Sequence, residues 1–144
     1  MMAKVIVYTD GACYDNPGPG GWAALINIDG NERMLSGGDH ATTNNRMELI
    51  AALKALQGIP EALTVAVYTD SEYLKLGVTE WLGEWKANNW KRKGGRLKNK
   101  DLWQLLDKVI NGRKLEWHWL KGHAGNPQNE RVDRMARVAL RKYL

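Results

Sequence analysis

The chain has 144 residues, of which 44% are apolar and 26% charged, with a formal net charge of +5. This length and composition exclude a disordered chain, and we expect a single globular domain over residues 1–144. No apolar run approaches the roughly 20 residues of a membrane span and no signal peptide is evident, while the only cysteine, Cys13, cannot form an internal disulfide, so we expect a cytoplasmic protein.

The first half of the chain predicts three strands and a helix. Residues 4–10 are a short apolar, β-branched run, which is typical of a buried strand. Residues 14–21 are rich in Asn, Pro and Gly and predict a loop. Residues 22–28 and 33–37 flank an Asp-Gly pair, which predicts a hairpin, and a helix is expected to start at the Thr-Thr-Asn-Asn run and reach about Gly58.

The second half predicts two further strands and four helices. The strands are expected at 64–70 and 115–120, and the helices at 71–77, 79–90, from a cap at Asp101 to 110, and 129–142. The resulting order, β-β-β-α-β-α-α-α-β-α, predicts an α/β fold with a mixed sheet and helices on both of its faces.

A six-residue string occurs twice, and each copy stops at an aspartate. Val5 to Asp10 reads VIVYTD, and Val65 to Asp70 reads VAVYTD. Two strands of this kind would bring two carboxylates to one edge of a sheet, where open α/β folds place their ligand crevices. Like charges there repel, and a divalent cation between them would remove that cost. Alternatively, Asp10 begins a turn and Asp70 caps a helix.

Two further acids lie near the starts of predicted helices. Glu48 follows Asn45 by three residues, as in a capping box, and Asp133 could interact favourably with a helix dipole. Together with Asp10 and Asp70, however, they could converge on one site for a hard cation. Oxygen ligands suit Mg²⁺ or Mn²⁺, and the absence of Cys/His ligand spacing argues against zinc.

The positive charge is concentrated in one segment. Lys86 to Lys100 holds seven basic residues and no acid, and the rest of the chain is slightly acidic. Tryptophans are interleaved with these bases, and basic residues mixed with aromatics are typical of a nucleic-acid partner. The alternative is an ordinary solvated run of charge. We call residues 81–100 the handle.

Five strings in the chain resemble the bacterial type 1 ribonuclease H family. They are YTDGACYDNPGPGGW, TTNNRMEL, YTDSEY, DLW and KGHAGNPQNERVD, and the resemblance covers essentially the whole chain. It implies the ribonuclease H fold, a five-stranded mixed sheet with flanking helices. It also implies an endonuclease that hydrolyses the RNA strand of RNA–DNA hybrids, leaving 5′-phosphate and 3′-hydroxyl ends, with two Mg²⁺ ions about 4 Å apart at the scissile phosphate.

The same resemblance implies roles for individual residues. Asp10, Glu48, Asp70 and Asp133 would be the metal-binding carboxylates, and His123 would assist proton transfer or product release. Cys13, Asn16, Asn44 and Asn45 would follow the RNA strand, whose 2′-hydroxyl distinguishes RNA from DNA. On the DNA side the resemblance implies contacts from Thr43, Asn99, Trp81 and Trp103, with Trp85, Lys86, Trp90 and Lys91 on the handle. Position 72, where relatives often carry a substrate-contacting Gln, is Glu72.

Simpler roles remain open for some of these residues, and so do other functions. Asn44 and Asn45 could cap a helix, and Trp103 could be a core contact beneath the handle. The partner we expect is a hybrid duplex, bound by a monomer without an obligate protein partner. The alternatives are a transposase, integrase or junction resolvase with the same strand-end carboxylates, and a non-catalytic nucleic-acid-binding module whose acids are structural.

Overall fold

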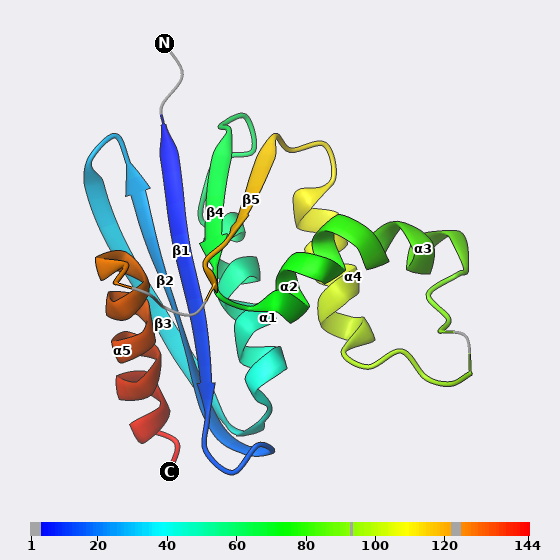
Figure 1. The fold of residues 1–144 in the computed structure, drawn as a ribbon, viewed down its shortest axis with the longest axis horizontal. Coiled ribbons are helices and arrows are strands. Elements are labelled where there is room, and N and C mark those ends of the chain that lie inside the picture. The colour runs from blue at the N-terminus through cyan, green and yellow to red at the C-terminus, as the bar shows by residue number, and fades with distance from the viewer. Residues whose placement is uncertain (1–3, 93, 122–124) are drawn as a thin grey trace.

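The computed structural model describes residues 4–92, 94–121 and 125–144. Five strands form one sheet in the order β3-β2-β1-β4-β5 (Figure 1). They are β1 (Val5–Cys13), β2 (Gly18–Ile28), β3 (Asn31–Thr42), β4 (Val65–Thr69) and β5 (Leu115–Trp119). The strands β1, β2 and β3 are antiparallel neighbours, whereas β4 is parallel to β1 and β5 is parallel to β4. The predicted mixed sheet is therefore confirmed.

The two copies of the repeated string lie side by side in the sheet. Val5 pairs with Val65 and the register continues without a shift to Thr9 and Thr69. Because the strands are parallel and in register, the last residue of each copy, Asp10 or Asp70, lies at the same level of the sheet. The first strand is longer than the predicted 4–10, since β1 continues past Asp10 to Cys13, whereas β4 stops just before Asp70. The two copies of the string in the sequence thus form two neighbouring parallel strands in the sheet.

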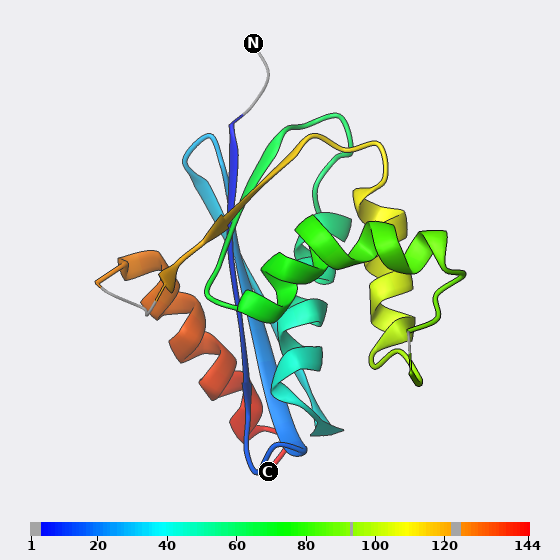
Figure 2. The same cartoon turned by 45° about the vertical axis from the view of Figure 1, so that its right-hand side comes forward.

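Helices cover both faces of the sheet, as predicted (Figure 2). The helix α5 (Pro127–Arg141) packs on β1, β2 and β3, and α1 (Asn44–Gln57) packs on the opposite face of β1 and β2. The helix α4 (Lys100–Ile110) packs against α1. Burial on both sides explains why the inner strands are nearly continuous apolar runs. No helix in the described part of the chain is both long and apolar enough to span a membrane.

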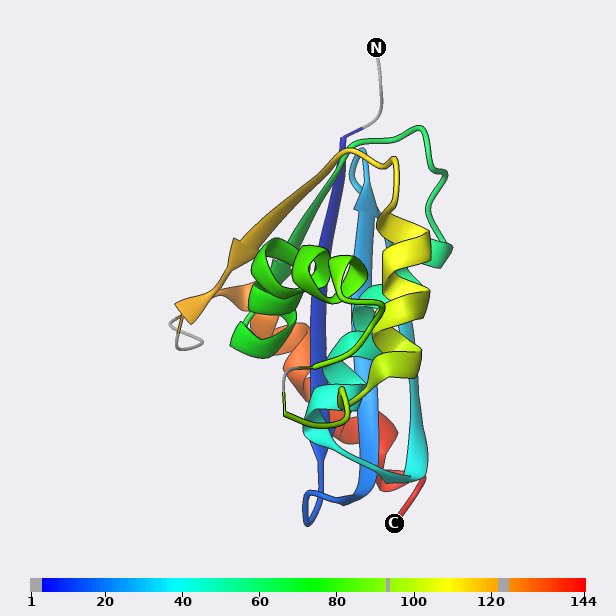
Figure 3. The same cartoon turned by 90° about the vertical axis from the view of Figure 1, so that its right-hand side faces the viewer.

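The handle projects away from the sheet, to the right in Figure 1, and lies in front of the sheet in Figure 3. It is entered through α2 (Glu72–Leu76), followed by a π-helical turn, η1 (Gly77–Trp81), and by α3 (Leu82–Ala87). Gly77 is required at this crossing, because a Cβ built on it would lie 1.9 Å from the ring of Trp103. The segment that leads into the handle is therefore anchored on α4 through direct contact between Gly77 and the buried Trp103.

Several predicted boundaries are wrong, and each has a local reason. Residues 18–21 belong to β2 and not to a loop, because the strand bulges there and its glycines allow close packing. The helix predicted over 79–90 ends at Ala87, and its first residues belong to the π-helical turn η1, which follows α2 without a break. Asp101 is not a cap, because α4 begins at Lys100 after Asn99.

The third strand is longer than the predicted 33–37, since β3 spans Asn31–Thr42. The last helix begins at Pro127, two residues before the predicted start, with Asn126 accepting a hydrogen bond from the Asn129 amide. Pro is favoured at this first helical position, because its missing N–H would have no intrahelical partner there. The hairpin at Asp29 and Gly30 is confirmed, and both residues have the positive φ that a tight two-residue turn needs.

Candidate active site

Glu48 is brought to Asp10 by a close approach of α1 to β1. A Cβ built on Gly11 would lie 2.6 Å from the backbone nitrogen of Glu48 and 2.8 Å from atoms of Met47. Only a glycine leaves room for the helix at this distance. The helix therefore contacts the strand directly beside the first copy of the repeated string.

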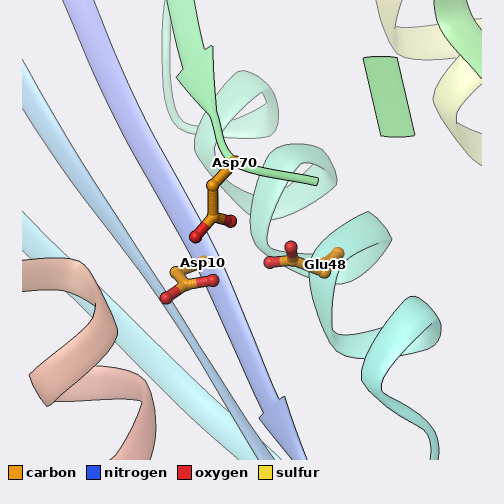
Figure 4. Close-up of side chains that lie close together, drawn as sticks. All are labelled: Asp10, Glu48 and Asp70. Carbon is orange, nitrogen blue, oxygen red and sulfur yellow. The ribbon is translucent and has the colours of Figure 1, made fainter. Parts of the chain in front are cut away.

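Three carboxylates converge at this point. Asp10 from β1, Glu48 from α1 and Asp70 from the residue after β4 point toward one another (Figure 4). One ligand atom from each lies within 4.8 Å of the other two. Asp10 and Glu48 are each 3% exposed, so two of these acids are almost completely removed from water.

Burial and mutual repulsion raise the pKa of the two buried acids. Desolvation first, and then the charge of Asp70, raise the pKa of Asp10 from 3.8 to about 8, with a smaller contribution from Asp133. The pKa of Glu48 is also well above its ordinary value, chiefly because of burial and of the charges of Asp10 and Asp70. Without a cation, the site therefore retains protons that ordinary carboxyl groups would release.

The acids have the free ligand atoms that a cation needs. Asp10 Oδ2 and Glu48 Oε1 are buried and accept no hydrogen bond within the described residues. Buried carboxylate oxygens in this state are costly unless a proton or a metal ion lies against them. An all-oxygen donor set of this kind fits a hard divalent cation.

The capping alternatives for two of these acids are wrong. The Ser71 hydroxyl caps α2 by accepting from the Leu74 amide, so Asp70 is not needed there. The Thr43 hydroxyl caps α1 by accepting from the Arg46 amide, so Glu48 belongs to no capping box. The turn interpretation of Asp10 is also wrong, because Asp10 and Gly11 lie within β1 and pair with β2; the Asp10 Oδ1 accepts from the Gly11 amide at 2.9 Å within the strand.

The fourth predicted acid lies at the rim of the same cleft. Asp133, on α5, lines a cleft of about 390 Å³ together with the three converging carboxylates. It lies two residues deeper in its helix than predicted, and its Oδ2 forms an ion pair with Arg137, four residues on. All four acids thus line the same cleft, and Asp133 is ion-paired with Arg137 there.

Polar side chains complete the cleft on the side of α1 and α2. Asn44, Asn45, Glu72 and Tyr73 line it with the acids. The loop between β1 and β2 is tied to this wall, because the Asn44 amide donates to Asn16 Oδ1 at 2.9 Å. Cys13, at the end of β1, is partly buried and directs its thiol toward carbonyl oxygens of Gly18 and Thr42, at 3.6 and 3.5 Å.

A second cleft leads from this wall onto the handle. It holds about 380 Å³ and is lined by Asn45, Asn99, Trp81 and Trp85 among others. Trp90 and Lys91 line an adjoining hollow beneath residues 95–101. Lys86 points elsewhere, because its ammonium pairs with Asp107 of α4 at 3.2 Å.

The assignment of Trp103 to the substrate surface is wrong. Its side chain is 0% exposed and packs against the rings of Tyr73 and Trp85. Its indole N–H donates to the Tyr73 hydroxyl at 3.0 Å. The core interpretation is therefore correct, and Trp103 supports the aromatic residues that form the cleft without reaching its surface.

Arg46 and Tyr73 are site residues that sequence reasoning missed. Arg46 donates two hydrogen bonds to the Asp101 carboxylate and one to Asn99 Oδ1, which joins α1 to the start of α4. Tyr73 Oη accepts from both Trp103 and Asn99. No spacing rule predicts the contacts of Arg46, since its partners lie more than fifty positions away. His123 lies outside the described residues.

The chain matches known proteins over nearly all of its length. The model of the RNase H family matches residues 2–141. The chain belongs to the RNase H family. A "Ribonuclease H" of Brucella ovis is 50% identical over 143 residues, which cover 99% of this chain and 93% of the relative. A "Ribonuclease H" of Paramagnetospirillum magneticum is 54% identical over 137 residues, which cover 94% and 89%.

Solved RNase H structures have the same fold. LC9-RNase H1, described as a type 1 RNase H with the type 2 active-site motif, superposes with a TM-score of 0.87 at 34% identity, covering all of this chain and 75% of its own. LC11-RNase H1, solved in complex with an RNA/DNA hybrid, superposes with a TM-score of 0.74 at 23% identity, covering 96% and 98%. RNase H proteins depend on divalent metal ions, which agrees with the three converging carboxylates.

Proposed function

We propose that this chain is an endoribonuclease that hydrolyses the RNA strand of RNA–DNA hybrids and leaves 5′-phosphate and 3′-hydroxyl ends. The observation that carries the proposal is the convergence of Asp10, Glu48 and Asp70, two of them with buried oxygens that accept no hydrogen bond among the described residues. Membership of the RNase H family supports the choice of substrate.

The carboxylates would hold Mg²⁺, with Mn²⁺ as a substitute. Asp10, Glu48 and Asp70 supply ligands from three different elements, so their spacing is set by the rigid sheet and α1. Asp133 would join them from the rim once its pairing with Arg137 is released. When bound, two such cations activate a water and stabilise the leaving oxygen of a phosphodiester.

The remaining residues would bind and orient the duplex. Asn44, Asn45 and Glu72 line the cleft beside the acids, where an RNA strand would lie, and Cys13 and Asn16 continue that track at the end of β1. Trp81, Trp85 and Asn99 line the cleft toward the handle, where the DNA strand would lie, with Thr43 nearby at the start of α1. His123, which falls outside the described residues, would assist proton transfer or product release.

A panel of duplexes tests the proposal. Labelled RNA–DNA, RNA–RNA and DNA–DNA duplexes of one sequence are incubated with the protein, with Mg²⁺, with Mn²⁺ and with a chelator. We expect cleavage of the RNA strand of the hybrid alone and only with a divalent ion. Cleavage of DNA would instead support a transposase or resolvase, and binding without cleavage would support a non-catalytic module.

Asp10→Asn isolates the role of the acids. We expect this variant to bind the hybrid and to lose its metal-dependent cleavage, because one ligand is removed from the interior of the site. Glu61→Gln, which removes an exposed acid that does not line the cleft, is the matched control and should cleave normally. Thermal unfolding adds a second measurement: Mg²⁺ should raise the Tm of the wild type and not that of Asp10→Asn.

We also propose that the protein acts as a monomer in the cytoplasm. The single cysteine, Cys13, suits a reducing compartment. Sedimentation at concentrations used for cleavage would test the oligomeric state, and a dimer would contradict this part of the proposal.

A further inference from the structure

A separate groove lies between the end of β1 and the C-terminal half of α5. It holds about 530 Å³ and is lined by Cys13 and Tyr14 on one side and by Arg137 and Arg141 on the other. Tyr14 is 58% exposed, which is unusual for a large aromatic side chain in this structure. The groove shares no lining residue with the cleft that holds the acids.

The charged side chains that line the groove are two arginines. Arg137 and Arg141 are four residues apart on α5, so they lie on one face of the helix and about 6 Å apart along its axis. The Arg137 side chain remains 62% exposed although it pairs with Asp133. Within residues 4–92, 94–121 and 125–144, no acid is ion-paired with Arg141.

Residues of α5 connect the groove to the site, although the two spaces share no lining residue. Asp133, Arg137 and Arg141 follow one another at successive turns of α5, so the helix leads from the rim of the acid cleft into the groove. On the other wall, Cys13 belongs both to the groove and to the proposed RNA track that includes Asn16. A strand that leaves the acids along the end of β1 would therefore pass between Tyr14 and the two arginines.

We propose that this groove is a backbone subsite for the RNA strand, on the side of the site that is remote from the handle. Arg141 binds a phosphate there, Arg137 does so when it is released from Asp133, and Tyr14 packs against the sugar or base between them. Guanidinium groups suit phosphate oxygens, and a polynucleotide presents one charge at every nucleotide. This inference depends on the proposed function, because it extends the same substrate beyond the cleft.

Arg141→Ala is the test variant, and Lys142→Ala is its control. Lys142 carries the same charge on the next residue, but it points about 100° around the helix and does not line the groove. Hybrid binding is measured at several salt concentrations, in an Asp10→Asn background so that the duplex is not cut. We expect Arg141→Ala to weaken binding about two- to fivefold and to reduce the slope of log Kd against log salt by about 1, with Lys142→Ala close to the parent.

Replacing single phosphates with uncharged analogues identifies which strand of the hybrid lies in the groove. Hybrids are made with one methylphosphonate at each position of the RNA strand, or of the DNA strand, in turn. One RNA position should weaken binding by the parent protein and have no further effect on Arg141→Ala. An effect restricted to DNA positions, or equal effects of the neutral phosphates on both proteins, would overturn the inference.

The outcomes separate the two proposals. If the wild type fails to cleave hybrids, the proposed function fails. If it cleaves hybrids and Arg141→Ala retains the salt slope of Lys142→Ala, only the RNA subsite fails. An acidic peptide that competes with the hybrid for the parent but not for Arg141→Ala, in the absence of any phosphate effect, would assign the groove to a protein partner and would also overturn the inference.

Discussion

Gly11 lies so close to the backbone of Glu48 that no side chain fits between β1 and α1 at that point. The contact joins the part of β1 that holds Asp10 to the part of α1 that holds Glu48, and it sets the distance between their carboxylates. Gly11, which has no side chain that could bind a metal ion, therefore determines the geometry of the candidate metal site.

Gly11→Ala should separate the two acids. The added methyl group would force α1 away from β1, which should lower the free energy of unfolding by about 1–3 kcal/mol. Since Glu48 moves with the helix, the rise in Tm on adding Mg²⁺ should also shrink. Gly83→Ala is the control, because a Cβ there meets nothing within 4 Å. A normal response to Mg²⁺ in Gly11→Ala would contradict this account.

The stability of the metal-free protein should fall as pH rises. The pKa of Asp10 is raised from 3.8 to about 8, so between these values the unfolded chain has released a proton that the folded protein still binds. Folding is then favoured by protons, and stability is lost progressively from about pH 4 to about pH 8. Denaturant unfolding in a chelator at pH 5 to 8.5 measures this slope.

Two comparisons check the origin of that slope. Asp10→Asn should flatten it and should stabilise the metal-free protein at pH 8, since the repulsion within the acid cluster is relieved. Glu61→Gln, at an exposed position, should leave the slope unchanged. A metal-free wild type that gains stability between pH 5 and 8 would show that other groups dominate.

Arg46→Lys should weaken substrate binding more than turnover. A lysine cannot reproduce the two parallel hydrogen bonds to Asp101 together with the bond to Asn99, so the start of α4 would lose its link to α1. Because Arg46 does not line the acid cleft, we expect an increase in KM of several-fold and a nearly unchanged kcat. Asp101→Asn should act in the same direction, and a selective loss of kcat in either variant would be inconsistent with this role.

Trp103→Phe and Trp81→Phe should affect different properties. Trp103 is completely buried and donates to Tyr73, so its replacement should lower the free energy of unfolding by about 1–3 kcal/mol. Trp81 lines the cleft toward the handle, and its replacement should raise KM with little loss of stability. Urea unfolding and steady-state cleavage are measured on both variants. A loss of stability in Trp81→Phe, or a raised KM with unchanged stability in Trp103→Phe, would contradict these roles.

Arg113→Ala should lower stability without affecting the chemistry. The Arg113 guanidinium donates to the carbonyl oxygens of Leu56, Ile59 and Pro60, which lie at or beyond the end of α1. Removing it leaves these acceptors without their donor and should cost about 1–3 kcal/mol. The kcat at a temperature well below the Tm should be unchanged, and a loss of kcat there would point to movement of α1 at the site.

The sequence by itself determined the element order and the chemistry of the site. The repeated string predicted two buried strands that bring acids to one edge of the sheet, because β-branched apolar runs of that length are typical of buried strands. The parallel pairing of β1 and β4 confirmed the strands, but Asp10 lies within β1, which continues to Cys13, and only β4 stops at its acid. The resemblance to ribonuclease H was carried by strings spread over the chain, and the family match confirmed it. Boundaries at Gly18 and Asp101 were wrong, because glycine-rich and capping patterns also occur inside elements.

Only the tertiary structure decided which side chains meet. The buried position of Trp103, the partners of Arg46 and the fit of α1 against Gly11 depend on segments far apart in the chain. Local patterns report propensity and periodicity, which involve neighbours within a few residues. The distances between segments that are far apart in the sequence are set by close packing of the whole core. These distances change when a residue is added or removed at a contact.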